Sequence, residues 1–197
     1  VAIVGGTIFE ATGGKFANGA ISGAIQAAMS GQPDEAAAGV SSEGAGEISD
    51  QTGASPEIMK MLSDPQTAQA GLRAMAAREH VYIPDEQILY EDVPYFRVRG
   101  RRAAAKIDSK TRIVTFSRAA IIRKDYWITL SYMQHEYGHW MDYTFGLGYP
   151  EVDEIRAYEF QMRDSNFKRT APWFQKGTMQ MLDSERALFR CKENATC

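Results

Sequence analysis

The pattern that most constrains this chain is His135-Glu136-Tyr137-Gly138-His139, an HExxH sequence within a run, residues 125–145, that favours a helix. On an α-helix, residues i and i+4 lie one turn apart on the same face, so both imidazoles can bind one metal ion. Glu136 lies beside them, where it can take a proton from a water molecule at the ion. Zn²⁺ suits two nitrogen ligands and one oxygen ligand. We therefore predict a zinc site with His135 and His139 as ligands and Glu136 as general base.

A third ligand must come from outside this motif. In metzincins it is a histidine six residues past the second one, and that position holds Phe145 here, which excludes the class. The next helix, expected from Pro150 to about Ser165, carries four acids: Glu151, Asp153, Glu154 and Glu159. At 100° per residue, Glu154 falls on the expected inward, apolar face, Asp153 points away, and Glu159 lies nearer the boundary. An acid on an apolar face is costly unless it is paired or bound to metal, so we favour Glu154 over Glu159.

Asp142 is a further candidate, because it follows His135 by seven residues on the same helical face. It could accept a hydrogen bond from an imidazole and so orient it, as metal-bound histidines usually require. It could equally pair with a nearby arginine. The sequence leaves both roles open.

The other patterns predict an α+β fold, with helices before and after a small antiparallel sheet. Helices are expected from Pro56, which follows the N-cap Ser55, and over residues 66–79, 125–145, 150–165 and 173–189. Strands are expected at 81–83 and 95–98 and in a hairpin with arms 103–107 and 112–116.

Residues 1–54 differ from the rest, being rich in Gly, Ala and Ser with one lysine against six acids. We predict a flexible linker there and a folded domain over 55–197. No apolar run is long enough to span a membrane, and no signal-peptide pattern is present. Because the chain begins with Val, we expect it to be part of a longer protein. Cys191 and Cys197 could close a small terminal loop, but we favour reduced thiols.

The segment 97–124 is basic, with ten Lys or Arg residues and one acid, Asp108. Such a segment could bind nucleic acid, dock an acidic protein or form a solvated hairpin. The net charge of −3 and the lack of interleaved aromatic residues argue against stable nucleic-acid binding.

HExxH followed by a glutamate from a downstream helix resembles the gluzincins, the thermolysin-like zinc peptidases. The segment DYTFGLGY, residues 142–149, is also similar to their connection between the ligand helices. The resemblance covers roughly residues 112–165 and implies a zincin-like fold, Zn²⁺, a peptide substrate and His135, His139 and Glu154 as ligands. The connection is shorter than in that family, and Tyr158 stands where the family has an aspartate.

Two further roles follow from this resemblance. Tyr149 or Tyr158 would supply the hydroxyl that stabilises the oxyanion formed during hydrolysis, although core packing is the other interpretation of each. In zincins an edge strand holds the substrate backbone by strand addition. Residues 112–116 would be that strand or an ordinary internal one.

The glycine-rich sequence GGKFANGAISGAI, residues 13–25, resembles the junction before the toxin domain of bacterial Rhs-type polymorphic toxins. It implies that residues 55–197 are a secreted effector for interbacterial competition, with a parent repeat shell and a cognate immunity protein as partners. We expect a zinc metalloprotease that cleaves a protein in the recipient cell's cytoplasm or periplasm. The alternatives are a zinc hydrolase of peptidoglycan peptide bonds and a non-peptidase toxin that binds nucleic acid through 97–124.

Overall fold

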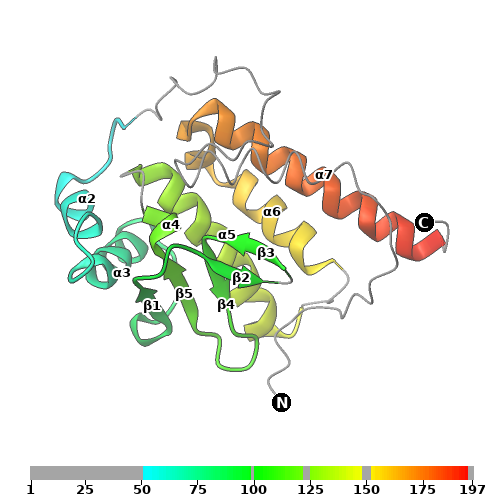
Figure 1. The fold of residues 1–197 in the computed structure, drawn as a ribbon, viewed down its shortest axis with the longest axis horizontal. Helices are drawn as coiled ribbons and strands as arrows, with labels where there is room; N and C mark the ends of the chain where they lie inside the picture. The colour runs from blue at the N-terminus through cyan, green and yellow to red at the C-terminus, as the bar shows by residue number, and fades with distance from the viewer. Residues whose placement is uncertain (1–50, 99, 122–124, 148–151, 195–197) are drawn as a thin grey trace.

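The computed structural model describes residues 51–98, 100–121, 125–147 and 152–194, and within these ranges the fold is α+β, as predicted (Figure 1). Two helices come first, then five short strands, then four more helices. The helices are α2 (Pro56–Leu62), α3 (Ala68–Arg78), α4 (Arg118–Ile121), α5 (Tyr126–Phe145), α6 (Asp153–Arg163) and α7 (Pro172–Asn194). The short 3₁₀ helices are η3 (Asp85–Gln87) and η4 (Ser165–Arg169). The linker predicted for residues 1–54 lies outside the described residues up to position 50.

The strands form a three-stranded sheet and a separate hairpin. The strands are β1 (Ile88–Glu91), β2 (Phe96–Val98), β3 (Arg101–Ala103), β4 (Ala105–Ile107) and β5 (Val114–Ser117). In the sheet, β5 lies between β1, to which it is parallel, and β4, to which it is antiparallel, while β2 pairs with β3. The predicted hairpin is confirmed as β4–β5, but the sheet is mixed because the chain returns beside β1 in the same direction.

One strand prediction is wrong, and one of the two alternatives for another strand is excluded. Residues 81–83 form no strand, although Val81 and Ile83 are buried in the core. β5 is buried over its whole length and has a neighbour on each side, so residues 112–116 are not an edge strand. Within the described sheet, the edges are β1 and β4.

The long helix α5 is fixed at both ends and packs into the centre of the molecule. The Asp125 side chain accepts a hydrogen bond from the Ile128 backbone N–H at 3.0 Å, and Gly146 ends the helix in the left-handed conformation with φ of 66°. One face of α5 contacts the core formed with α2, α3 and the sheet, through Tyr126, Leu130 and Met133 among others. Burying each such side chain contributes roughly 1.5–3 kcal/mol, so the HExxH helix is rigidly held.

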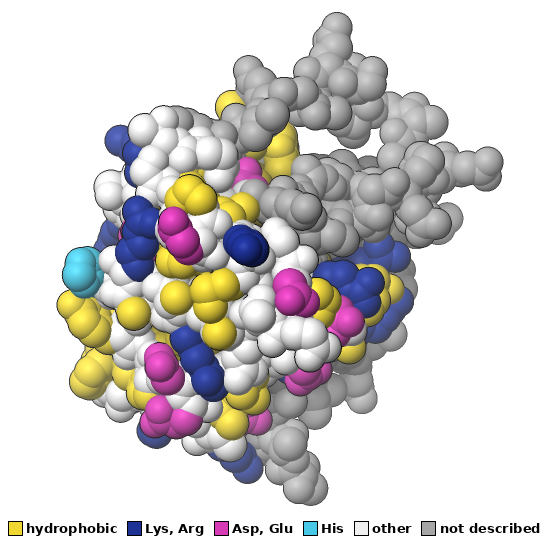
Figure 2. Space-filling model, turned by 90° about the vertical axis from the view of Figure 1, so that its left-hand side faces the viewer, with side chains coloured by type: hydrophobic (Ala, Val, Ile, Leu, Met, Phe, Trp, Pro, Cys, Tyr) yellow, Lys and Arg dark blue, Asp and Glu magenta, His cyan; other side chains and the backbone are white. Residues whose placement is uncertain are grey.

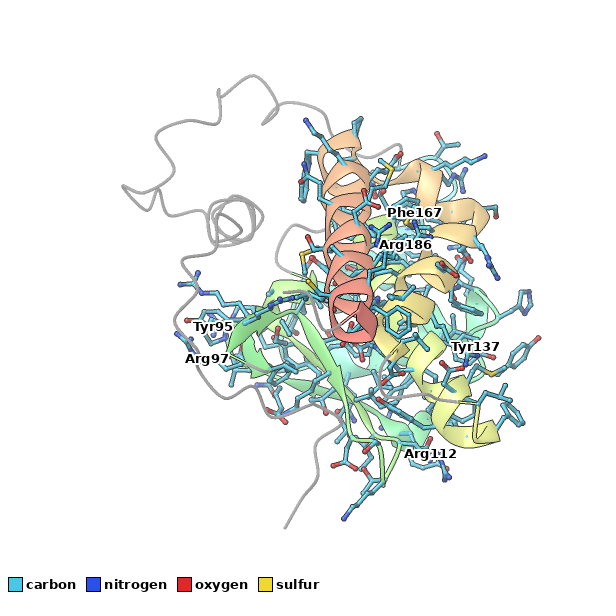
Figure 3. The ribbon with its side chains drawn as sticks, turned by 90° about the vertical axis from the view of Figure 1, so that its right-hand side faces the viewer. Tyr95, Arg97, Arg112, Tyr137, Phe167 and Arg186 are labelled. Carbon is cyan, nitrogen blue, oxygen red and sulfur yellow. The ribbon has the colours of Figure 1, made fainter. Side chains whose placement is uncertain are left out.

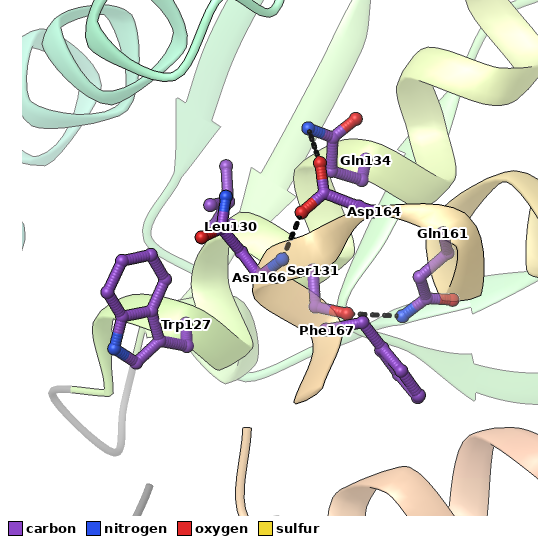
Figure 4. A pocket seen from close by; sticks show the side chains of 8 residues that line it. All are labelled: Trp127, Leu130, Ser131, Gln134, Gln161, Asp164, Asn166 and Phe167. Atoms are coloured by element: carbon purple, nitrogen blue, oxygen red, sulfur yellow. Dashed lines mark hydrogen bonds between the residues drawn. The ribbon is translucent and has the colours of Figure 1, made fainter. Parts of the chain in front are cut away.

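Helix α6 lies against α5, and polar contacts join them. Gln134 donates to Asp164 at 2.9 Å, and Gln161 donates to the Ser131 hydroxyl at 2.8 Å (Figure 4). Helix α6 begins without a hydrogen bond from the side chain of its N-cap, Val152. Its first turn therefore depends on contacts with α5.

The inward face of α6 differs from the predicted one. Its buried residues are Asp153, Ala157 and Gln161, so the prediction that Asp153 points away from the core is wrong. The reason is the close approach of the helices at Gly138. A Cβ atom there would lie 3.2 Å from the Ala157 Cα and 3.3 Å from the Phe160 Cβ. The small residues Gly138 and Ala157 thus allow the close approach, and Phe160 packs beside them.

Replacing Gly138 with Val is expected to destabilise the protein by about 1–3 kcal/mol, because the added methyl groups overpack the α5–α6 contact. Urea denaturation monitored by circular dichroism measures this free energy of unfolding. As a control, Ala70→Val at an exposed position of α3 should cost only the helix propensity difference, below ~0.7 kcal/mol. Equal effects of the two substitutions would show that the contact at Gly138 is not tight.

Two observations concern the remaining sequence predictions. Among the described helices, none combines the length and the apolar character needed to cross a membrane. Cys191, near the end of α7, is disulfide-bonded, so the interpretation as a reduced thiol is wrong for this residue. Cys197 lies outside the described residues.

Candidate metal centre

Three predicted ligands converge where α5 meets the start of α6. His135 and His139 lie on successive turns of α5, and Glu154 lies in the first turn of α6. Glu154 Oε2 lies 3.4 Å from His135 Nε2 and 3.7 Å from His139 Nε2. One ligand atom from each residue falls within 4.8 Å of the others, so the cluster can hold a metal ion.

The other acid weighed for the third position lies elsewhere. Glu159 forms ion pairs with Arg186 at 2.9 Å and with Arg163 at 3.6 Å, on the side of α6 that faces α7 and solvent. The preference for Glu154 over Glu159 therefore agrees with the geometry.

The donor set fits zinc. Ligands about 2.0–2.1 Å from a tetrahedral ion are separated from one another by about 3.3 Å, which is close to the two spacings between Glu154 and the histidines. Two imidazole nitrogens and one carboxylate oxygen form a typical catalytic zinc set, which leaves one position for water or substrate. Within the described part of the chain, this is the one such group of His, Cys, Asp and Glu residues.

The charges of the cluster are strongly coupled. Burial alone would raise the pKa of Glu154, but the two histidines hold it well below the usual range. Burial opposes protonation of His139, yet Glu154 and Asp153 raise the pKa of its imidazole well above the usual value. The carboxylates thus stabilise positive charge at the His139 imidazole. A metal ion and protons would compete for the same nitrogen atoms.

Glu136 lies on the same helix as the histidines and is 7% exposed. Burial raises the pKa of its carboxyl group, while the charges of His135 and His139 oppose this effect. A carboxylate with a raised pKa accepts a proton more readily near neutral pH, as a general base requires. The carboxyl group of Glu136 therefore lies near enough to His135, His139 and Glu154 for their charges to act on its pKa.

The acid that is hydrogen-bonded to a histidine is Asp153, not Asp142. Asp153 accepts a hydrogen bond from His139 Nδ1 at 3.0 Å and a second from the Tyr143 hydroxyl at 2.5 Å. Asp142 forms an ion pair with Arg156 at 2.7 Å, which was the other role considered for it. Burial would raise the pKa of Asp153, but its two hydrogen bonds hold it below the usual value.

Sequence reasoning missed the roles of Asp153 and Tyr143. The pair Asp153-Glu154 at the start of a helix was the available signal, since adjacent acids point in directions about 100° apart. Arg156 also donates to the backbone carbonyl of Leu147, so it ties the end of α5 to the beginning of α6.

Of the two tyrosines proposed to stabilise an oxyanion, Tyr158 lies at the site. Its ring packs against His135 with ring centroids 4.5 Å apart, and its side chain is half-buried. Burial and the nearby Glu154 raise the pKa of the Tyr158 hydroxyl well above the usual value, so it is a proton donor rather than a phenolate. Tyr149 lies outside the described residues.

Several described basic residues of segment 97–124 lie apart from one another or pair with acids. Figure 3 shows Arg97 and Arg112 well apart, at different ends of the strands. Arg101 pairs with Glu185 at 2.9 Å, and Arg118 pairs with Asp92 at 3.0 Å. On the face that includes α2 and α3, acidic and basic side chains are interspersed (Figure 2). What the basic segment binds stays a prediction.

No protein-family model matches the chain, and comparison with characterised proteins and with solved structures gives no match. The function is therefore argued from the site itself.

Proposed function

We propose that the chain is a zinc-dependent peptidase. The observation that carries this proposal is the convergence of His135, His139 and Glu154 on one point, with the buried carboxylate of Glu136 beside it. Two imidazoles, one carboxylate ligand and a separate carboxylate base are the groups that hydrolysis of a peptide bond at a zinc ion requires. The resemblance of the motif to the gluzincins supports the same reaction.

In the proposed peptide hydrolysis, the zinc ion and the protein side chains have different roles. When bound, zinc supplies a Lewis acid that polarises the scissile carbonyl and lowers the pKa of a water molecule toward ~7. Glu136 accepts the proton of the attacking water and then donates it to the nitrogen of the departing amine. The Tyr158 hydroxyl, close to His135, is proposed to donate a hydrogen bond to the carbonyl oxygen as negative charge develops there.

The substrate backbone is proposed to pair with β4 rather than with β5. β4 is an antiparallel edge of the three-stranded sheet and contacts α5, the helix that carries HExxH. An extended peptide can add to such an edge through main-chain hydrogen bonds, which gives affinity with little dependence on the peptide's sequence.

A zinc-removal experiment tests the peptidase proposal. The purified protein is expected to contain about one zinc ion per chain and to cleave members of a mixed peptide library, with new termini identified by mass spectrometry. Removal of zinc by a chelator should abolish cleavage, and added Zn²⁺ should restore it, because the ion supplies several kcal/mol of transition-state stabilisation. His135→Ala should carry no zinc. Cleavage that persists without the ion, or protein that binds no zinc, would contradict the proposal.

We further propose that the peptidase acts as an antibacterial effector delivered into a recipient cell. The support is the resemblance of residues 13–25 to the junction of Rhs-type toxins, and these residues lie outside the described ones. The proposal implies a parent repeat shell and a cognate immunity protein as partners. Expression with and without a periplasmic leader separates a cytoplasmic protein target from peptidoglycan, since only the second requires export.

A further inference from the structure

We propose that Asp153 and Tyr143 form a positioning pair that holds the imidazole of His139 in the orientation needed to bind zinc. The inference rests on the zinc site of the proposed function and adds two residues to it. Neither residue is a ligand, and neither would touch substrate. Their effect is on the affinity of the site for the ion.

The Asp153 carboxylate is held on both sides. Its Oδ1 accepts from His139 Nδ1, its Oδ2 accepts from the Tyr143 hydroxyl, and the residue is 4% exposed. With both oxygens bound, the carboxylate cannot rotate without losing a buried hydrogen bond, which costs about 1–3 kcal/mol. A proton fixed on Nδ1 leaves Nε2, which lies 3.7 Å from Glu154 Oε2, as the nitrogen of His139 that can bind a metal ion.

Tyr143 completes this arrangement from the same helix as its histidine. It lies one turn after His139 on α5, and the two rings are stacked at 6.0 Å between centroids with 13° between planes. The ring thus limits rotation of the imidazole, while the hydroxyl limits rotation of the carboxylate. Both restraints therefore limit the movement of the His139 imidazole.

His135 is held differently. Its Nδ1 is buried without a hydrogen-bond partner among the described residues, and its ring is fixed by packing against Tyr158. His139 is consequently the histidine that hydrogen bonds orient. Loss of Asp153 should therefore affect zinc binding more than loss of an equally buried acid that does not touch a histidine.

The chain supplies that matched control in Asp142. It is 5% exposed, lies at the same contact between α5 and α6, and pairs with Arg156 instead of a histidine. The Asp153→Asn and Asp142→Asn variants of the full chain keep similar volume and each remove one buried charge. Zinc dissociation constants are measured by competition with a chromogenic chelator, and folding of each variant without zinc is followed by thermal denaturation.

Asp153→Asn is expected to weaken zinc binding by ~10–100-fold, the usual effect of losing a partner of a metal-bound histidine. Tyr143→Phe, which keeps the ring and removes one hydrogen bond, should weaken it by about five-fold. Asp142→Asn should leave the zinc constant within about two-fold. With Co²⁺ in place of zinc, the visible spectrum should change in the Asp153 and Tyr143 variants and not in the Asp142 variant.

The outcomes separate this inference from the proposed function. Wild-type protein that binds no zinc would overturn both. If the wild-type protein binds zinc, two results would overturn the positioning pair alone. In one, Asp153→Asn binds zinc as tightly as the wild type does. In the other, Asp142→Asn binds zinc as weakly as Asp153→Asn does. If Asp153→Asn does not fold, Tyr143→Phe decides, since an unchanged zinc constant and Co²⁺ spectrum in that variant would refute the role.

Discussion

Replacing Glu136 with Gln is expected to reduce peptide hydrolysis by about 10²–10⁴-fold while the protein keeps its zinc. The amide has nearly the same size as the carboxylate but cannot accept the proton of the attacking water. Because Glu136 is not among the three ligands that converge, the substitution should leave metal content at about one ion per chain. Initial rates on the best-cleaved library peptide and metal analysis by mass spectrometry measure both quantities.

The same variant also tests the toxin proposal. If hydrolysis causes toxicity, expression of Glu136→Gln in bacteria should be harmless although the protein folds and binds zinc. A fully toxic Glu136→Gln, or a variant that cleaves peptides at the normal rate, would contradict a role for this carboxylate as base. Loss of zinc along with activity would assign Glu136 to metal binding instead.

Replacing Glu154 with Ala is expected to weaken zinc binding by more than the ~10–100-fold typical of a residue that only orients a ligand. The substitution removes one of three protein ligands and leaves two histidines, which need an additional donor to hold zinc firmly. Chelator competition provides the dissociation constant, and the zinc-dependent increase in melting temperature should disappear as well.

Glu159→Ala on the same helix is the natural comparison for this experiment. Glu159 pairs with Arg186 and Arg163 at a partly exposed position, and such pairs contribute at most ~1 kcal/mol to stability. Zinc affinity should be unchanged in this variant. A loss of zinc in Glu159→Ala but not in Glu154→Ala would reverse the assignment of the third ligand.

The helices and the principal residues of the site could be predicted because their signals are local. The i, i+4 spacing of His135 and His139 fixes their relation on any helix, and Asp125 and Gly146 are residue types suited to the two ends of α5. The class α+β followed from the order of periodic segments. The choice of Glu154 over Glu159 came from the helical-wheel argument, and Glu154 lies in the cluster although the buried face of α6 is not the one assumed.

The parts that could not be predicted depend on contacts between distant segments. The position of β5 between β1 and β4 depends on a pairing between residues 88–91 and 114–117, which no local pattern reveals. The role of Asp153 depends on how closely α6 approaches Gly138, which sets the rotation of α6 about its own axis. A helical-wheel argument assumes that the largest apolar residues face inward, and here Ala157 and the polar residues Asp153 and Gln161 do so instead.

The first turn of α6 carries both Glu154 and Asp153, and its N-cap side chain contributes no hydrogen bond. Fraying of this single turn would move the ligand Glu154 away from the ion and would break the hydrogen bond from His139 to Asp153 at the same time. Escape of the ion and local opening of the backbone would then be one kinetic event, so the residence time of the metal would be set by how rarely those few peptide units unwind.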